Sequence, residues 1–114
     1  MKIVHKNQAK EFKNSDACIA FEYQLEDKDI NGTIIELNGR YPSKGKAVNL
    51  KCKELAYIIE GSGKIVIQKE ETKLNQRDMV LIQPGEEYFW EGNLKMLLCC
   101  SPAWSPEQYK EIDS

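Results

Sequence analysis

Apolar and polar residues alternate along most of the chain, in short runs separated by turn-forming residues. Alternation over four to eight residues is typical of a strand with one face in a core and the other in water. Turn signals such as Asn31-Gly32, Asn38-Gly39 and Pro84-Gly85 recur roughly every ten residues. The pattern therefore predicts an all-β protein, either a sandwich or a barrel.

The expected strands cover residues 17–25, 33–37, 46–50, 53–60, 64–69, 79–82, 87–91 and 94–100. Gly61-Ser62-Gly63 marks a turn between two of them. One helix is expected over residues 105–112. Ser105 suits its N-cap, Pro106 its first position, and Gln108 the closing side chain of a capping box.

Length and composition narrow the class of protein. The chain has 114 residues, which fits a single domain with a core of its own. Its 16 basic and 18 acidic residues give a net charge of −2, so no basic field favours nucleic acid or an anionic membrane. The segment 1–12 lacks the apolar stretch of a secretory signal, and no run is long enough to cross a membrane. A cytoplasmic protein is expected.

The four cysteines show no C-x-x-C spacing, which argues against a structural zinc site. In a reducing compartment the expected state is free thiols that pack as small apolar residues. Cys99 and Cys100 are neighbours on an expected strand, so their side chains should point to opposite faces.

Two segments carry a family resemblance. In the first, Glu54 is followed by LAYIIE and then Gly61; in the second, Asp78 precedes MVLI, the Pro84-Gly85 turn and Tyr88. These segments resemble the two sequence motifs of the cupin superfamily, in the same order and at a similar separation. The resemblance covers about residues 33–109.

The resemblance implies a fold and an assembly. The expected fold is all-β: a double-stranded β-helix, or jelly-roll, cupin barrel with a short C-terminal helix. One domain would span 1–114, with a barrel core at about 33–100, an N-terminal strand arm at 1–30 and a C-terminal tail and helix at 101–114. Small cupins commonly dimerise, so a homodimer is expected.

The chain departs from the cupin motifs at their metal ligands. Cupins with all ligands hold a divalent metal through three histidines and a glutamate, and of these only Glu54 is present. The histidine positions fall on Ala47 and Asn49, or on Val48 and Leu50 with a shorter spacing, and on Tyr88. The single histidine, His5, lies outside both motifs. The usual metal cofactor is therefore not expected. An atypical set of Cys52, Glu54 and Tyr88, with Asn49 and one of Cys99 or Cys100, could still bind a soft metal.

The remaining chemistry centres on Glu54 and Tyr88 as candidate catalytic residues. A desolvated Glu54 would act as a general acid or base, and Tyr88 would donate to a developing oxyanion. The candidate ligand-binding residues are Asn49, Cys52, Arg77 and Trp90. Another interpretation pairs Glu54 with Lys51, Lys53 or Arg77 at the surface.

These residues support three functional hypotheses. The first is a metal-free cupin that binds a small polar organic molecule, with isomerase- or epimerase-like acid–base chemistry. The second is a non-catalytic ligand-sensing or ligand-binding module. The third is a metalloprotein with the atypical ligand set of cysteine, glutamate and tyrosine. None of the three calls for a nucleic-acid or membrane partner.

Overall fold

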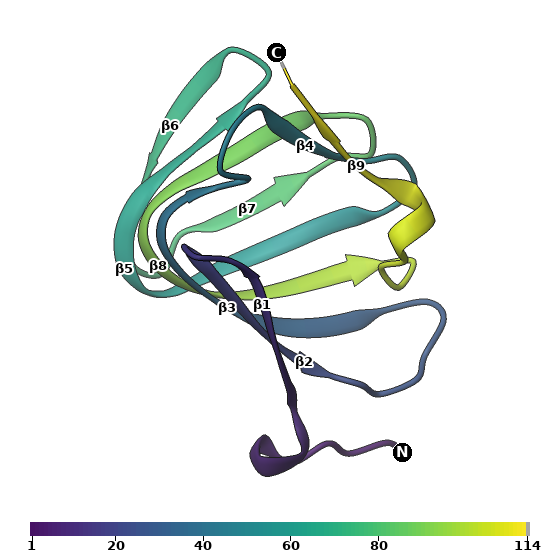
Figure 1. Ribbon diagram of the computed structural model, residues 1–114. Helices are drawn as coiled ribbons and strands as arrows, with labels where there is room; N and C mark the ends of the chain where they lie inside the picture. The colour runs from purple at the N-terminus through teal and green to yellow at the C-terminus, as the bar shows by residue number, and fades with distance from the viewer. Residues whose placement is uncertain (114) are drawn as a thin grey trace.

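The computed structural model describes residues 1–113 and consists of strands with two 3-10 turns (Figure 1). The elements in chain order are η1 (Lys6–Gln8), β1 (Lys10–Ser15), β2 (Cys18–Tyr23), β3 (Asn31–Tyr41), β4 (Lys46–Asn49), β5 (Lys53–Ile67), β6 (Glu70–Leu74), β7 (Met79–Ile82), β8 (Glu87–Ser101), η2 (Pro106–Gln108) and β9 (Tyr109–Ile112). Neither 3-10 turn within these residues has the length or hydropathy of a helix that crosses a membrane.

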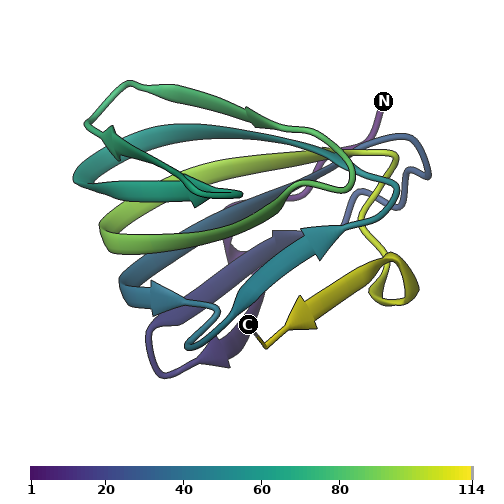
Figure 2. The ribbon, with the colours of Figure 1, turned by 90° about the horizontal axis from the view of Figure 1, so that it is seen from above.

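All strand pairs are antiparallel and belong to one strongly curled sheet. Along one path the strand order is β1-β2-β3-β8-β4-β9, and β5 pairs with β6, β7 and β8. Figure 1 shows the long strands β3, β5 and β8 bending round the same side of the molecule, and Figure 2 shows the two resulting layers from above. The all-β, jelly-roll prediction is confirmed.

The three long strands are not interrupted where the sequence suggested turns. β3, β5 and β8 each run through a glycine, and Gly39, Gly92 and Gly63 lie in one cross-strand row. Gly92 has a φ of 140°, and a Cβ atom added there would collide with the Cα of Gly63. Glycine in a strand often marks a sharp bend with close backbone approach. The expected turns at Asn38-Gly39 and Gly61–Gly63 are therefore wrong: these glycines bend the strands.

The C-terminal helix expected over 105–112 is also wrong. Ser105 and Pro106 do begin a helical turn, but only the 3-10 turn η2 forms, and the Ser105 side chain makes no capping hydrogen bond. The Gln108 side chain is buried and bonds to the segment 49–52 instead of closing a capping box. Residues 109–112 then pair with β4 as β9. Their pairing with the sheet replaces the helix.

Alternate side chains of each strand fill the interior between the two layers. β5 contributes Ala56 and Ile58, and β8 contributes Trp90, Leu94 and Met96, all of them buried. One buried cluster draws on residues from β2 through β8. The interior is not filled everywhere, and the space left beside this cluster forms the candidate site.

Candidate functional site

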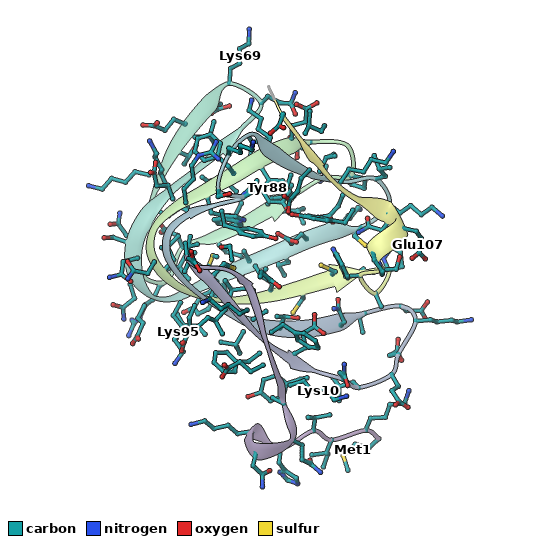
Figure 3. The ribbon with its side chains drawn as sticks, viewed as in Figure 1. Met1, Lys10, Lys69, Tyr88, Lys95 and Glu107 are labelled. Atoms are coloured by element: carbon teal, nitrogen blue, oxygen red, sulfur yellow. The ribbon has the colours of Figure 1, made fainter. Side chains whose placement is uncertain are left out.

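A pocket of about 200 Å³ opens inside the curled sheet, between β2, β3, β5, β8 and the segment that precedes β9. Its walls are mostly apolar and include Ile35, Leu37 and Met96. Aromatic rings of Tyr88 and Trp90 complete the wall on β8. Figure 3 shows Tyr88 within the interior rather than on the outer surface. The pocket therefore combines an apolar lining with a few polar groups, as ligand sites usually do.

Glu54 belongs to this interior face because of strand alternation. Its neighbours Lys53 and Leu55 are exposed, whereas Glu54 is only 5% exposed and lines the pocket. The ion pairs found among residues 1–113 do not involve Glu54. The alternative interpretation, in which Glu54 pairs with lysine or arginine at the surface, is therefore wrong for this structure.

The Glu54 carboxyl group has few partners for a buried acid. Its Oε1 accepts long hydrogen bonds from Asn49 Nδ2 at 3.4 Å and from the Cys100 thiol at 3.7 Å. Its Oε2 is buried and has no hydrogen-bond partner within the described residues. Burial raises the pKa of Glu54 to about 7, and the hydrogen bonds from Asn49 and Cys100 only partly oppose that rise. Both protonation states are therefore populated near neutral pH.

Tyr88 lies beside this carboxyl group and keeps its own proton. It is 4% exposed, and its hydroxyl oxygen accepts a hydrogen bond from Asn49 Nδ2 at 3.4 Å. Its ring meets Trp90 edge to face, with ring centroids 6.4 Å apart. Burial, and then the charge of Glu54, raise the pKa of Tyr88 well above its ordinary value. The phenol therefore remains a hydrogen-bond donor.

Asn49 forms hydrogen bonds to both candidate catalytic residues, Glu54 and Tyr88, and Gln108 forms a hydrogen bond to Asn49. The Asn49 amide bonds to both Glu54 and Tyr88, although Asn49 itself does not line the pocket. Gln108 donates from Nε2 to Asn49 Oδ1 at 2.9 Å. The Gln108 Oε1 accepts from the backbone N–H groups of Lys51 and Cys52, each at 3.2 Å. This network fixes both ends of the Asn49 amide.

The structure brings together four of the six residues singled out in the sequence: Glu54, Tyr88, Asn49 and Trp90. Cys52 is buried, but it does not line the pocket, and its thiol lies 3.9 Å from the Ala103 carbonyl oxygen. Arg77 is exposed in the turn before β7, where its N–H donates to Ile58 O. Neither Cys52 nor Arg77 is placed to contact a ligand in this pocket.

Three residues of the site were not assigned there from the sequence. Gln108 was interpreted as a helix cap because it follows Ser105 and Pro106. Cys100 was one of two alternatives, since alternation says only that Cys99 and Cys100 face opposite ways; Cys100 is the one that faces Glu54. Glu22 on β2 also lines the pocket, and no motif marked it.

The donors around Glu54 do not fit the metal centre that complete cupin motifs build. Two of its histidine positions hold Ala47 and Asn49, or Val48 and Leu50 with the shorter spacing, and the third holds Tyr88. Burial, followed by the charge of Glu54, raises the pKa values of the Cys100 thiol and of Tyr88, so neither readily becomes an anionic ligand. Within residues 1–113, no three His, Cys, Asp or Glu side chains cluster as metal ligands. The atypical cysteine-containing set is not assembled either, because Cys52 does not line the pocket.

Comparison with solved structures identifies the fold. Pac13, described as a unique nucleoside dehydratase, superposes with a TM-score of 0.90 over 99% of this chain and 92% of Pac13, at 14% identity. An RmlC-like cupin from Shewanella frigidimarina superposes with a TM-score of 0.73 over 88% of this chain and 89% of its own, at 13% identity. This chain has the cupin fold.

Further comparisons bear on the same fold. Ectoine synthase from P. lautus superposes on this chain with a TM-score of 0.73 over 98% of this chain and 90% of the synthase, at 14% identity. A variant of Streptomyces Pac13 was solved with uridine. No protein-family model and no curated protein sequence matches the chain. The cupin fold that the two motifs imply is therefore confirmed by these structures.

Proposed function

We propose that this cupin binds a small organic molecule in its pocket and moves a proton to or from it through Glu54. The observation that carries the proposal is the Glu54 carboxyl group. It lines an apolar pocket, its Oε2 has no partner within the described residues, and burial raises its pKa to about 7. A general acid or base works best when its pKa lies near the working pH.

The arrangement suits proton transfer next to a carbonyl group. The ionised Glu54 would take a proton from the carbon beside the carbonyl, and the electron pair of that C–H bond would move onto the carbonyl oxygen. Tyr88 would donate a hydrogen bond to this oxygen as its charge develops. Return of the proton from Glu54 to the γ-carbon of a β,γ-unsaturated carbonyl compound, with the electron pair moving back from the oxygen, completes an isomerisation. An epimerisation would take its new proton from water on the opposite face, while Glu54 keeps the first proton.

The side-chain amide of Asn49 would hold Glu54 and Tyr88 in position for this chemistry. Glu54 Oε1 and the Tyr88 hydroxyl oxygen each lie 3.4 Å from Asn49 Nδ2. Groups held in a fixed geometry need no reorganisation during the reaction, which is a main source of catalytic rate. Trp90 would supply an apolar surface for the ligand, and Asn49 would position the two reacting groups without touching it.

The pocket volume limits the size of the ligand. An apolar cavity of about 150 Å³ in another protein accommodates benzene. The pocket of about 200 Å³ therefore suits a molecule with one ring or a short chain. That a Pac13 variant was solved with uridine, and that other proteins of this fold are enzymes such as ectoine synthase, supports a small organic ligand in the barrel.

Hydrogen exchange offers a test that does not require the natural substrate. Pools of small carbonyl compounds would be incubated with the protein in D₂O and analysed by mass spectrometry for replacement of C–H by C–D. We expect exchange in at least one compound, with a rate that rises with pH about a midpoint near 7, because the ionised carboxylate is the base.

Two variants connect that exchange to the site. Glu54→Gln keeps the shape of the side chain and should abolish exchange, whereas Tyr88→Phe should slow it roughly a hundredfold. Glu60→Gln, at an exposed position of the same strand, is the matched control and should exchange normally. Tight ligand binding without any Glu54-dependent exchange would contradict proton transfer and favour the sensing module.

A further inference from the structure

The charges around the pocket are of one sign. Two carboxylates line it, those of Glu54 and Glu22, and no lysine, arginine or histidine of residues 1–113 does so. Arg40, an obvious candidate to pair an anionic ligand, lies over the Phe89 ring at 3.8 Å and donates to backbone carbonyls of the loop that follows β3. An anionic ligand would therefore meet repulsion and no cationic side chain among the described lining residues.

The pocket is also rich in aromatic rings, which attract cations through their faces. The lining rings are those of Tyr41, Tyr88, Trp90, Trp104 and Tyr109. Trp104 and Tyr109 pack with their ring centroids 5.6 Å apart, and Trp104 remains 37% exposed. Aromatic rings combined with a carboxylate form the usual protein site for an organic ammonium group.

The two carboxylates lie at different ends of the pocket. Glu22 is partly exposed on β2, opposite Thr33, whereas Glu54 is buried on β5. The strand order β2-β3-β8-β5 separates them by three strand spacings, about 14 Å along the sheet. The side chain of Asn31, two residues from Thr33 on the same strand, accepts the backbone N–H of Trp104, which holds Trp104 in the pocket wall beside β3.

Glu22 is available for a ligand at this end. Its carboxylate makes no hydrogen bond or ion pair with the residues of 1–113. Lys10 lies opposite Glu22 in the β1–β2 register, but Lys10 is exposed and does not form an ion pair with it. The buried Oε2 of Glu54, which has no hydrogen-bond partner among the described residues, is the second polar group that a ligand could contact.

We propose that the pocket selects small organic cations, with the ammonium group at Glu22, an apolar ring or chain among the aromatic residues, and the reacting end at Glu54. This inference rests on the proposed function, because it names the substrate class of the same site. Glu22 acts as the specificity residue for charge, and Glu54 remains the acid and base.

Three probes of nearly equal size test the proposal: 2-phenylethylamine, 2-phenylethanol and phenylacetate. They place a positive, a neutral and a negative group beside the same ring. We expect titration calorimetry or ligand-observed NMR to show the amine binding roughly tenfold more tightly than the alcohol, and phenylacetate binding most weakly. The advantage of the amine should shrink at high salt because the rim of the pocket is in contact with water.

Glu22→Gln should remove most of the difference between amine and alcohol while leaving the affinity for the alcohol unchanged. Glu36→Gln makes the same change of charge at an exposed position on the outer face of β3 and should preserve the difference. If both variants lose the preference for the amine over the alcohol equally, the role of Glu22 is overturned, because the preference would then depend only on the net charge of the protein. Equal binding of the amine and the alcohol to the native protein, or preferred binding of phenylacetate, would overturn selection of cations.

The outcomes separate this inference from the proposed function. Glu54→Gln should still prefer the amine but should not support hydrogen exchange. If exchange depends on Glu54 and the probes bind without regard to charge, proton transfer stands and selection of cations fails. If none of the three probes binds at millimolar concentration, the pocket does not accept ring-bearing ligands, and selection of cations fails with it.

Discussion

At the scale of a single residue, the burial of Glu54 makes the native protein sensitive to pH. The pKa of Glu54 rises from an ordinary 4.5 to about 7 on folding. Below about pH 4.5 both the folded and the unfolded chain hold the proton. As the pH rises towards 7 the unfolded chain releases it first, so the free energy of unfolding falls by roughly 3 kcal/mol and then levels off.

Glu54→Gln should remove this pH dependence. A glutamine of the same shape does not titrate, so the variant should gain roughly 2 to 3 kcal/mol relative to the native protein between about pH 5 and pH 8. Urea unfolding of both proteins at the two pH values measures this difference. Glu60→Gln, which changes an exposed carboxylate on the same strand, should follow the native protein. A difference that does not vary with pH would contradict the raised pKa of Glu54.

The sequence located Glu54 and Tyr88 because motif spacing and strand alternation both act over short distances. Arg77 and Cys52 were misplaced because charge and chemical type do not say which way a side chain points. Arg77 lies in a tight turn with a φ of 75°, and Cys52 packs against the backbone near Ala103. Glu22 was missed because its place at the pocket follows from curling of the sheet, which no local pattern encodes.

At the scale of an element, the segment of η2 and β9 acts as a brace for the site. The Gln108 side chain makes three hydrogen bonds. It donates to the side-chain oxygen Oδ1 of Asn49 and accepts from the backbone N–H groups of Lys51 and Cys52. Pairing of β9 with β4 holds Gln108 against this loop. The geometry around Glu54 thus depends on Gln108, a residue far from it in the sequence.

Gln108→Ala should destabilise the fold and shift the titration of the site. Loss of three hydrogen bonds in a buried position should cost roughly 1–3 kcal/mol, measured by urea unfolding. The hydrogen bond from Asn49 lowers the pKa of Glu54, so a loosened Asn49 should move the midpoint of the hydrogen-exchange rate to higher pH. Glu107→Ala, at the exposed neighbouring position, should leave both properties unchanged. A lower stability with an unshifted midpoint would limit Gln108 to a structural role.

The strands themselves were largely predictable, because alternation reports burial of one face. The ends of the strands were not predictable near glycine, because glycine occurs both in turns between strands and at bends within a strand. Gly39 and Gly63 belong to segments that were predicted as turns, yet together with Gly92 they form a row at which three paired strands bend. Likewise, Ser105 and Pro106 favour a helix locally, and pairing of Tyr109–Ile112 with β4 overrides that preference.

At the scale of the whole molecule, an apolar area on the outer face of the sheet favours the expected homodimer. It consists of Leu55 and Tyr57 on β5, Met79 and Leu81 on β7, and Leu97 on β8. These residues lie opposite one another in the strand register, and Met79 is 61% and Leu81 49% exposed. The next row carries Lys95 beside Glu36, so two copies related by a two-fold axis could pair opposite charges. We propose a second copy of the chain as the occupant.

Leu81→Lys should disrupt this dimer. A charge in the middle of an apolar contact is costly to desolvate, so light scattering should give the mass of a monomer for the variant and of a dimer for the native protein. Lys69→Glu, in the exposed turn between β5 and β6, should remain dimeric. A monomeric native protein would contradict the proposal. The cytoplasmic location and the lack of a nucleic-acid partner stay predictions from composition.

The dependence of Asn49 on Gln108 has a consequence for how the protein comes to be made. A ribosome delivers most of the residues that line the pocket, from Asn14 to Trp104, before it delivers Gln108, which holds Asn49 in place. The barrel can begin to collapse while Asn49 is still unsupported, because the contacts among β3, β5 and β8 already exist. The Glu54 carboxyl group therefore has the complete hydrogen-bond network behind Asn49 only once Gln108 has emerged. A partly synthesised chain without Gln108 would pair β3, β5 and β8 but would leave the Asn49 side chain without its Gln108 hydrogen bond.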